Sequence, residues 1–191
     1  MFKQTESSIN TYVSAIAIAN TLMFARVLIE TYITNPQITE IVLLPYLAAV
    51  AYGGVFSYYF YKKSQKSVQS SISKLEKNPL ELNEAIKFAL IFAFIYALVE
   101  YTNTKYGNLG IYIVSFISGF TDVDAITLSL GELSKKSLGL EYAATGIAIA
   151  SLSNTVTKFF IVLFFNKKLA LKTLLFFIPE IIILLSVFLL A

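Results

Sequence analysis

The sequence predicts an all-α polytopic membrane protein, and three observations lead to that fold class. First, 57% of the 191 residues are hydrophobic, and the mean hydropathy is +0.70. Second, 14% of the residues are charged, whereas about a quarter are charged in soluble domains. Third, about six apolar segments follow one another, each near the roughly 20 residues that cross a bilayer. We therefore expect a single integral membrane domain over residues 1–191.

Short polar stretches separate the six segments. In chain order the segments cover Ile9–Ile33, Ile38–Tyr61, Pro79–Asn103, Gly107–Leu130, Glu141–Phe165 and Leu169–Ala191. The third has a marked start, because Asn78 is a favourable N-cap and Pro79 fits the first helical position. A lysine-rich loop over residues 62–78 precedes it. By the positive-inside rule we expect this loop and the N-terminus to be cytoplasmic, in the plasma membrane of a prokaryote.

Two aspartates lie in the fourth apolar segment and are its only charges. They are Asp122 and Asp124, and the rest of residues 107–130 is apolar or neutral. A carboxylate at membrane depth costs about 3 kcal/mol or more unless it is paired, protonated or hydrated. We therefore expect both side chains to line a polar site inside the protein, and an ion, proton or substrate pathway is the leading hypothesis.

The fourth segment is expected to be broken or re-entrant rather than one straight helix. Residues i and i+2 point roughly 200° apart on a helix, so Asp122 and Asp124 cannot share a helix face. The run Ser118-Gly119-Phe120-Thr121 supplies a break, and Thr121 with Asp124 three residues later resembles a capping box. The alternative is that the two acids only cap a half-helix.

The first two segments resemble the last two as an internal repeat. Asn20 and Pro45 recur as Asn154 and Pro179 with the same spacing. Chance similarity among apolar helices is the alternative. A spanning fourth segment would make the repeats parallel, and a re-entrant one would make them inverted, an arrangement found in many transporters.

Bases also occur inside apolar segments, with Arg26 in the first and Lys158 in the fifth. These bases either neutralise the aspartates in a central network or snorkel to the membrane interface. Glu180 is a further acid in the middle of a segment. Glu30 and Glu100 lie nearer the segment ends, where we expect them to be solvated.

Four stretches of the chain resemble a known family. They are N-T-L-M-F-A-R at Asn20–Arg26, N-P-L-E-L at Asn78–Leu82, the aspartate motif at Ser118–Leu130 and L-S-N-T-V-T-K at Leu152–Lys158. They are similar to the membrane domain of unknown function found C-terminal to MgtC/SapB-type domains. The similarity spans nearly the whole chain, and the MgtC-like half is not part of this sequence. The resemblance implies magnesium-related physiology and supports the aspartate site, but it does not imply a particular activity.

We expect a channel or transporter for cations that forms a homo-oligomer in the lipid bilayer. The chain has no Cys and no His, which leaves oxygen ligands and hence a hard cation such as Mg²⁺, Na⁺, K⁺ or Ca²⁺. No other cofactor is expected, and the lysines indicate topology rather than nucleic-acid binding. The expected binding residues are Asp122, Asp124, Thr121, Ser118, Thr127, Asn20 and Asn154, with the two aspartates as metal ligands and Arg26 and Lys158 as charge-balancing groups.

The sequence suggests three alternative functions. An intramembrane aspartyl protease needs two aspartates that face each other, which an i, i+2 pair does poorly, so we do not expect an enzyme. The main alternative is a non-transporting structural or regulatory membrane subunit whose acids and bases form a buried ion-pair network. A last alternative is an anionic substrate held by Arg26, Lys158 and a half-helix N-terminus, and the two acids argue against it.

Overall fold

The computed structural model describes residues 6–64 and 82–191, and these ranges contain helices and turns but no strand. The helices are α1 (Glu6–Thr34), α2 (Pro36–Ser64), α3 (Leu82–Tyr106), α4 (Asn108–Gly119), α5 (Asp124–Ser134), α6 (Leu140–Phe165), α7 (Lys167–Leu185) and α8 (Val187–Leu190). Within the described residues, five helices are long and apolar enough to cross a membrane, namely α1, α2, α3, α6 and α7. The predicted all-α membrane fold is confirmed. Asn78, Pro79 and most of the lysine-rich loop lie outside the described residues.

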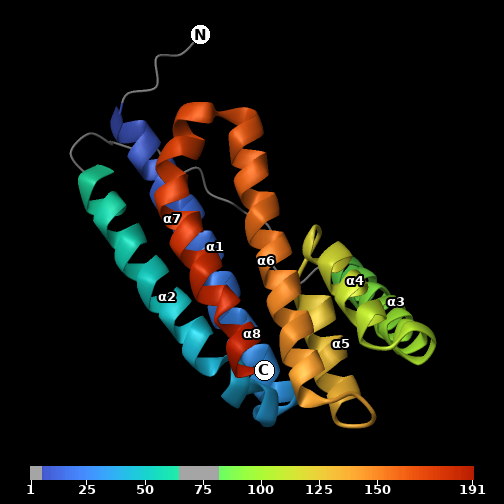
Figure 1. Cartoon of the computed structure of the whole chain (residues 1–191). Helices are drawn as coiled ribbons and strands as arrows, with labels where there is room; N and C mark the ends of the chain where they lie inside the picture. The colour runs from blue at the N-terminus through green and yellow to red at the C-terminus, as the bar shows by residue number, and fades with distance from the viewer. Residues whose placement is uncertain (1–5, 65–81) are drawn as a thin grey trace.

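Two long helix pairs, α1–α2 and α6–α7, form the main bundle and run in opposite directions (Figure 1). The helix α1 runs from the upper to the lower end of the molecule in that view, whereas α6 runs from the lower to the upper end. The turn between α1 and α2 therefore lies at the lower end, and the turn between α6 and α7 at the upper end. This is the arrangement of an inverted repeat. The superposition of Asn20 on Asn154 stays a prediction.

The mid-helix prolines occupy matching places in the two pairs. The residue after Pro45 is Tyr46, whose hydroxyl lies 2.7 Å from Ser151 Oγ on α6. The residue after Pro179 is Glu180, whose Oε2 accepts a hydrogen bond from α1 at 2.6 Å. In both pairs, the second helix thus contacts the first helix of the other pair directly after its proline.

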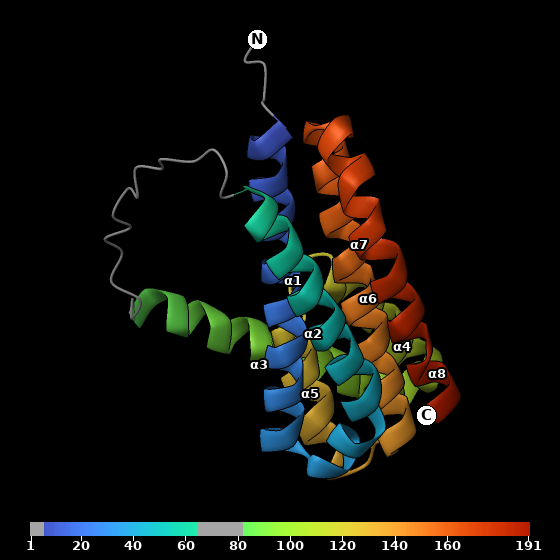
Figure 2. The same ribbon diagram turned by 90° about the vertical axis from the view of Figure 1, so that its left-hand side faces the viewer.

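The middle of the chain forms a separate hairpin and then a half-helix. The helices α3 and α4 meet at Gly107, whose φ of 61° is readily adopted by glycine. The helix α3 lies across the main bundle rather than along it (Figure 2). The chain then turns, and α5 runs toward the lower end among α1, α3, α4 and α6. The predicted break in the fourth segment is confirmed, because Phe120–Val123 separate α4 from α5.

Candidate functional site

Side chains of α6 satisfy the backbone where α4 ends. The carbonyl of Gly119 accepts a hydrogen bond from Asn154 Nδ2 at 2.9 Å, and the carbonyl of Phe116 accepts one from Ser153 Oγ at 2.8 Å. A Cβ on Gly119 would overlap the carbonyl of Ala150, so the absence of a side chain lets α4 end against α6. Helix ends leave carbonyls without helical partners, and these contacts explain how a break is tolerated inside the protein.

One carboxylate oxygen of Asp122 accepts hydrogen bonds from the backbone N–H groups where α5 begins. Its Oδ1 accepts from the N–H of Val123 at 2.8 Å and from the N–H of Asp124 at 3.3 Å. The expected capping box is wrong, because Thr121 Oγ1 donates to the carbonyl of Ser118 at 3.0 Å instead, and Val123 is the N-cap of α5. Helix capping therefore accounts for one oxygen of Asp122, but it gives no reason for a carboxylate two residues later.

Asp124 pairs with the single arginine of the chain. Arg26 Nη2 contacts Asp124 Oδ2, and Arg26 Nε donates to Glu30 Oε1 at 3.0 Å. The two carboxylate side chains are 5% and 12% exposed, whereas the arginine side chain is 58% exposed. Arg26 therefore lies between two buried acids while much of its surface remains open.

The second base belongs to a separate polar chain that joins α6, α1 and α7. Lys158 Nζ donates to Asn20 Oδ1 at 2.9 Å and lies 3.3 Å from the sulfur of Met23. Asn20 Nδ2 in turn donates to Glu180 Oε2 at 2.6 Å. Asn20 and Glu180 are fully buried, so an amide links this base to a fully buried carboxyl group.

Both aspartates and both bases line one cavity of about 320 Å³ beside the break. Its lining residues are Ala19, Leu22, Met23, Arg26, Thr121, Asp122, Val123, Asp124, Asn154 and Lys158. The other residues named from the sequence lie elsewhere. Ser118 is buried in the last turn of α4, Thr127 is fully buried in α5, and Asn20 lies between Lys158 and Glu180.

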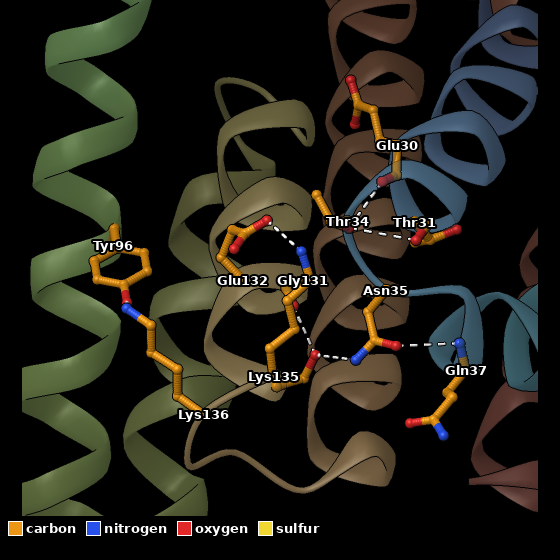
Figure 3. Close-up of polar contacts among 11 residues, drawn as sticks. Glu30, Thr31, Thr34, Asn35, Gln37, Tyr96, Gly131, Glu132, Lys135 and Lys136 are labelled. Atoms are coloured by element: carbon orange, nitrogen blue, oxygen red, sulfur yellow. Dashed lines mark hydrogen bonds and ion pairs between the residues drawn. The ribbon is translucent and has the colours of Figure 1, made fainter.

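The lower part of α5 is fastened to α1 and to the turn that follows it (Figure 3). Asn35 Nδ2 donates to Ser134 Oγ at 2.8 Å, and Asn35 Oδ1 accepts from the N–H of Gln37 at 3.1 Å. One turn higher, a Cβ on Gly131 would overlap Thr34 Oγ1, so α5 and α1 approach closely there. These contacts hold the end of α5 against the end of α1.

One acid in this region differs from what the sequence suggested. Glu30 was expected to be solvated, but the residue is 9% exposed and bonds Arg26. Positions i and i+4 lie one turn apart on a helix, so the spacing of this pair was the available signal. The contact between Glu180 and Asn20 had no such signal, because 160 residues separate them.

Within the described residues, no group of three or more acidic, His or Cys side chains converges on a metal-sized site. A cation at this cavity would therefore depend on the two aspartates together with neutral oxygens. Carboxylates combined with carbonyl oxygens are ligands that hard cations accept.

Comparisons with known proteins identify a family to which this chain is similar. The family model described as "Domain of unknown function (DUF4010)" matches residues 1–166. An "Uncharacterized protein" of Aquifex aeolicus (strain VF5) is 39% identical over 153 residues, which cover 78% of this chain. The matched part spans 65% of the length of that relative. No solved structure matches the chain. The resemblance to a membrane domain of unknown function is confirmed, and the link to magnesium stays an expectation.

Proposed function

The chain belongs to the family Domain of unknown function (DUF4010), and we propose that it is a membrane transport protein that carries a small cation through the cavity beside the α4–α5 break. One observation carries the proposal, namely that both aspartates and both bases line a single open cavity. The cavity volume of about 320 Å³ is about ten times the share of one water in the liquid. A purely structural ion-pair network has no need of such a space.

The charge around the cavity favours a cation over an anion. Three carboxylates line the cavity or bond a residue that lines it, namely those of Glu30, Asp122 and Asp124. The positively charged side chains there are two, Arg26 and Lys158. The excess negative charge acts where the effective dielectric constant is low, which strengthens its attraction for a cation. This balance argues against an anionic substrate.

A neutral oxygen is also available at the cavity. Asn154 lines it and is 8% exposed. Its Nδ2 bonds the end of α4, whereas its Oδ1 is buried without a hydrogen-bond partner. Buried acceptors normally have a partner, and an amide oxygen is a common ligand of hard cations. A bound cation would give this oxygen its partner.

In the proposed mechanism, Arg26 competes with the transported cation for Asp124. The guanidinium group pairs with Asp124 when the cavity holds no cation, and it also bonds Glu30. An arriving cation takes Asp124, and Arg26 keeps its bond to Glu30. The cation then shifts the population from the paired to the separated arrangement, which is how a ligand couples to a conformational change.

The lysines indicate how the protein sits in the membrane. Lys62 and Lys63 end α2, and Lys167 and Lys168 begin α7, so all four lie at the upper end of Figure 1. The loop after α5 carries two lysines at the lower end. By the positive-inside rule the upper end, where α1 begins, is cytoplasmic in this proposal.

A homo-oligomer is part of the proposal because the cavity has an open flank. The side chain of Arg26 is 58% exposed, and Leu22 one turn away is 61% exposed. An arginine facing acyl chains in a membrane is costly. A second copy packed against this flank of α1 would separate the cavity from lipid.

The second candidate function is a structural or regulatory membrane subunit. The bond of Asp122 to the start of α5 and the pairing of Asp124 with Arg26 favour it. Paired buried charges are compatible with a purely structural role. Under this candidate, no ion crosses the membrane and the charges matter for stability alone.

Flux measurements separate the two candidates. Wild type, Asp122→Asn, Asp124→Asn and the control Glu141→Gln, which changes an exposed acid, are compared in proteoliposomes for flux of Mg²⁺, K⁺, Na⁺ and H⁺. We expect flux of one of these ions in wild type and in the control, and its loss in both aspartate variants. Asparagine caps a helix about as well as aspartate, so a capping role alone predicts normal flux in the variants. Absence of flux in wild type would favour the structural subunit.

A further inference from the structure

A further buried carboxyl group lies outside the cavity and has no part in the cation site described above. Glu180 is fully buried in α7. Its Oε2 accepts one hydrogen bond, from Asn20 Nδ2 at 2.6 Å, and its Oε1 is buried without a partner. An ionised carboxylate with so few donors is far more costly to bury than the neutral acid. The surroundings therefore suit a carboxyl group that holds a proton.

The helices around Glu180 offer it one positive charge. On α6, the ammonium group of Lys158 lies on the other side of Asn20. On α2, the titratable side chain that Glu180 influences is Tyr52, whose hydroxyl donates to the carbonyl of Leu175 at 2.5 Å. The helix α1 contributes the neutral residues Asn20 and Thr21. Lys158 is therefore the group through which the charge of this acid reaches the cavity.

We propose that Glu180 is the proton-binding site of the transport cycle and that Asn20 and Lys158 couple it to the cation site. The inference rests on the proposed function. Lys158 lines the cavity together with Asp122 and Asp124. Ionised Glu180 holds the ammonium group at Asn20, which leaves the aspartates to the cation. Protonation of Glu180 weakens this hold, and the ammonium group, which lines the same cavity, then competes more strongly with the cation for the aspartates.

Proton and cation binding therefore oppose each other. In the exchange step the O–H bond of the Glu180 acid breaks, the proton goes to water, and a cation enters the cavity. Coupling between two sites is reciprocal at equilibrium, so a bound cation lowers proton affinity at Glu180 as much as a proton lowers cation affinity. The chain then exchanges protons for cations across the membrane.

Infrared spectroscopy tests the proton site without any transport assay. Wild-type protein in detergent at neutral pH should show the C=O band of a protonated carboxylic acid. The band should be lost in Glu180→Gln and kept in the control Glu141→Gln. In Asn20→Ala it should shift, because the bond to Oε2 is removed, and this variant serves if Glu180→Gln does not fold. No band in wild type, a band that persists in Glu180→Gln, or an unshifted band in Asn20→Ala would overturn the proposal.

Proton release tests the coupling. Addition of Na⁺, K⁺ or Mg²⁺ to weakly buffered wild-type protein should release protons, and Glu180→Gln should release none. In proteoliposomes, a pH gradient should drive cation flux in wild type and not in Glu180→Gln. Flux that follows the pH gradient equally in both would overturn the proton site while transport stands. A band lost in Glu180→Gln together with no flux in wild type would leave the proton site and refute the transport function.

Discussion

Neutralising Arg26 and Asp124, singly and together, distinguishes a transport role of this ion pair from a structural role. The single variants are Arg26→Gln and Asp124→Asn, and the third carries both changes. A structural pair that is replaced by two neutral side chains loses no partner, whereas a transport site loses its carboxylate. Stability and flux should therefore respond differently to the double change.

The exposures of the two side chains give the expected order of stability. Arg26→Gln leaves Asp124, 5% exposed, without its counter-ion, and breaking a buried pair in this way costs about 3 kcal/mol. Asp124→Asn leaves a 58% exposed arginine that keeps its bond to Glu30 at 3.0 Å, so its cost should be about 1 kcal/mol, in the range of exposed pairs. The double variant should recover most of the larger loss.

The assay combines thermal unfolding in detergent, with and without cations, and flux in proteoliposomes. Arg26→Gln should gain stability when the transported cation is added, by about 2.7 kcal/mol at a concentration 100 times the dissociation constant. The double variant should be stable but inactive, because a cation about 4 Å from a carboxylate gains about 4 kcal/mol at an effective dielectric constant near 20, and asparagine lacks that charge. Normal flux in the double variant would refute the reasoning.

Three further predictions concern packing and topology. Gly53→Ala should destabilise the protein by about 1–3 kcal/mol through overpacking, because its Cβ would overlap a hydroxyl of α1, whereas Gly54→Ala should be tolerated, since nothing outside its own stretch of helix lies within 4 Å of its Cβ; equal melting temperatures for the two variants would contradict this packing. Asn35→Ala should lower the free energy of unfolding by about 1–2 kcal/mol, because the cap of α2 and the bond to α5 are lost together, and an unchanged denaturation midpoint would argue against it. Single cysteines at Lys136 and Lys168 should react with an impermeant maleimide from opposite membrane faces, since they lie at opposite ends of the bundle; reaction from the same face would refute the inverted arrangement.

The fold class and the break could be predicted because local properties determine them. Long apolar runs indicate membrane helices whatever their neighbours are, and Gly119 followed within five residues by Asp122 and Asp124 makes a continuous helix unfavourable. The cost of burying Asp122 and Asp124 also predicts that polar groups surround them. These inferences need no knowledge of how the helices pack.

The residues around the aspartates could be predicted only in part, because they depend on how each helix is rotated against its neighbours. Asn154 and Thr121 line the cavity, whereas Ser118 and Thr127 do not. If one helix were rotated by half a turn, other residues of that helix would line the cavity, although the sequence would be the same. The contact of Glu180 with Asn20 joins helices from the two ends of the chain, and no pattern within one segment reports it.

Anomalous diffraction from crystals soaked in Tl⁺ or Mn²⁺ would locate a cation bound in the cavity, because each ion replaces a physiological cation and is identified by its own anomalous signal. We expect an anomalous peak in the cavity beside Asp122, Asp124 and Asn154, with Arg26 withdrawn from Asp124 toward Glu30. The peak should be absent from the Asp124→Asn protein soaked in the same way. An empty cavity with Arg26 still paired to Asp124 at saturating concentrations of both ions would contradict the account.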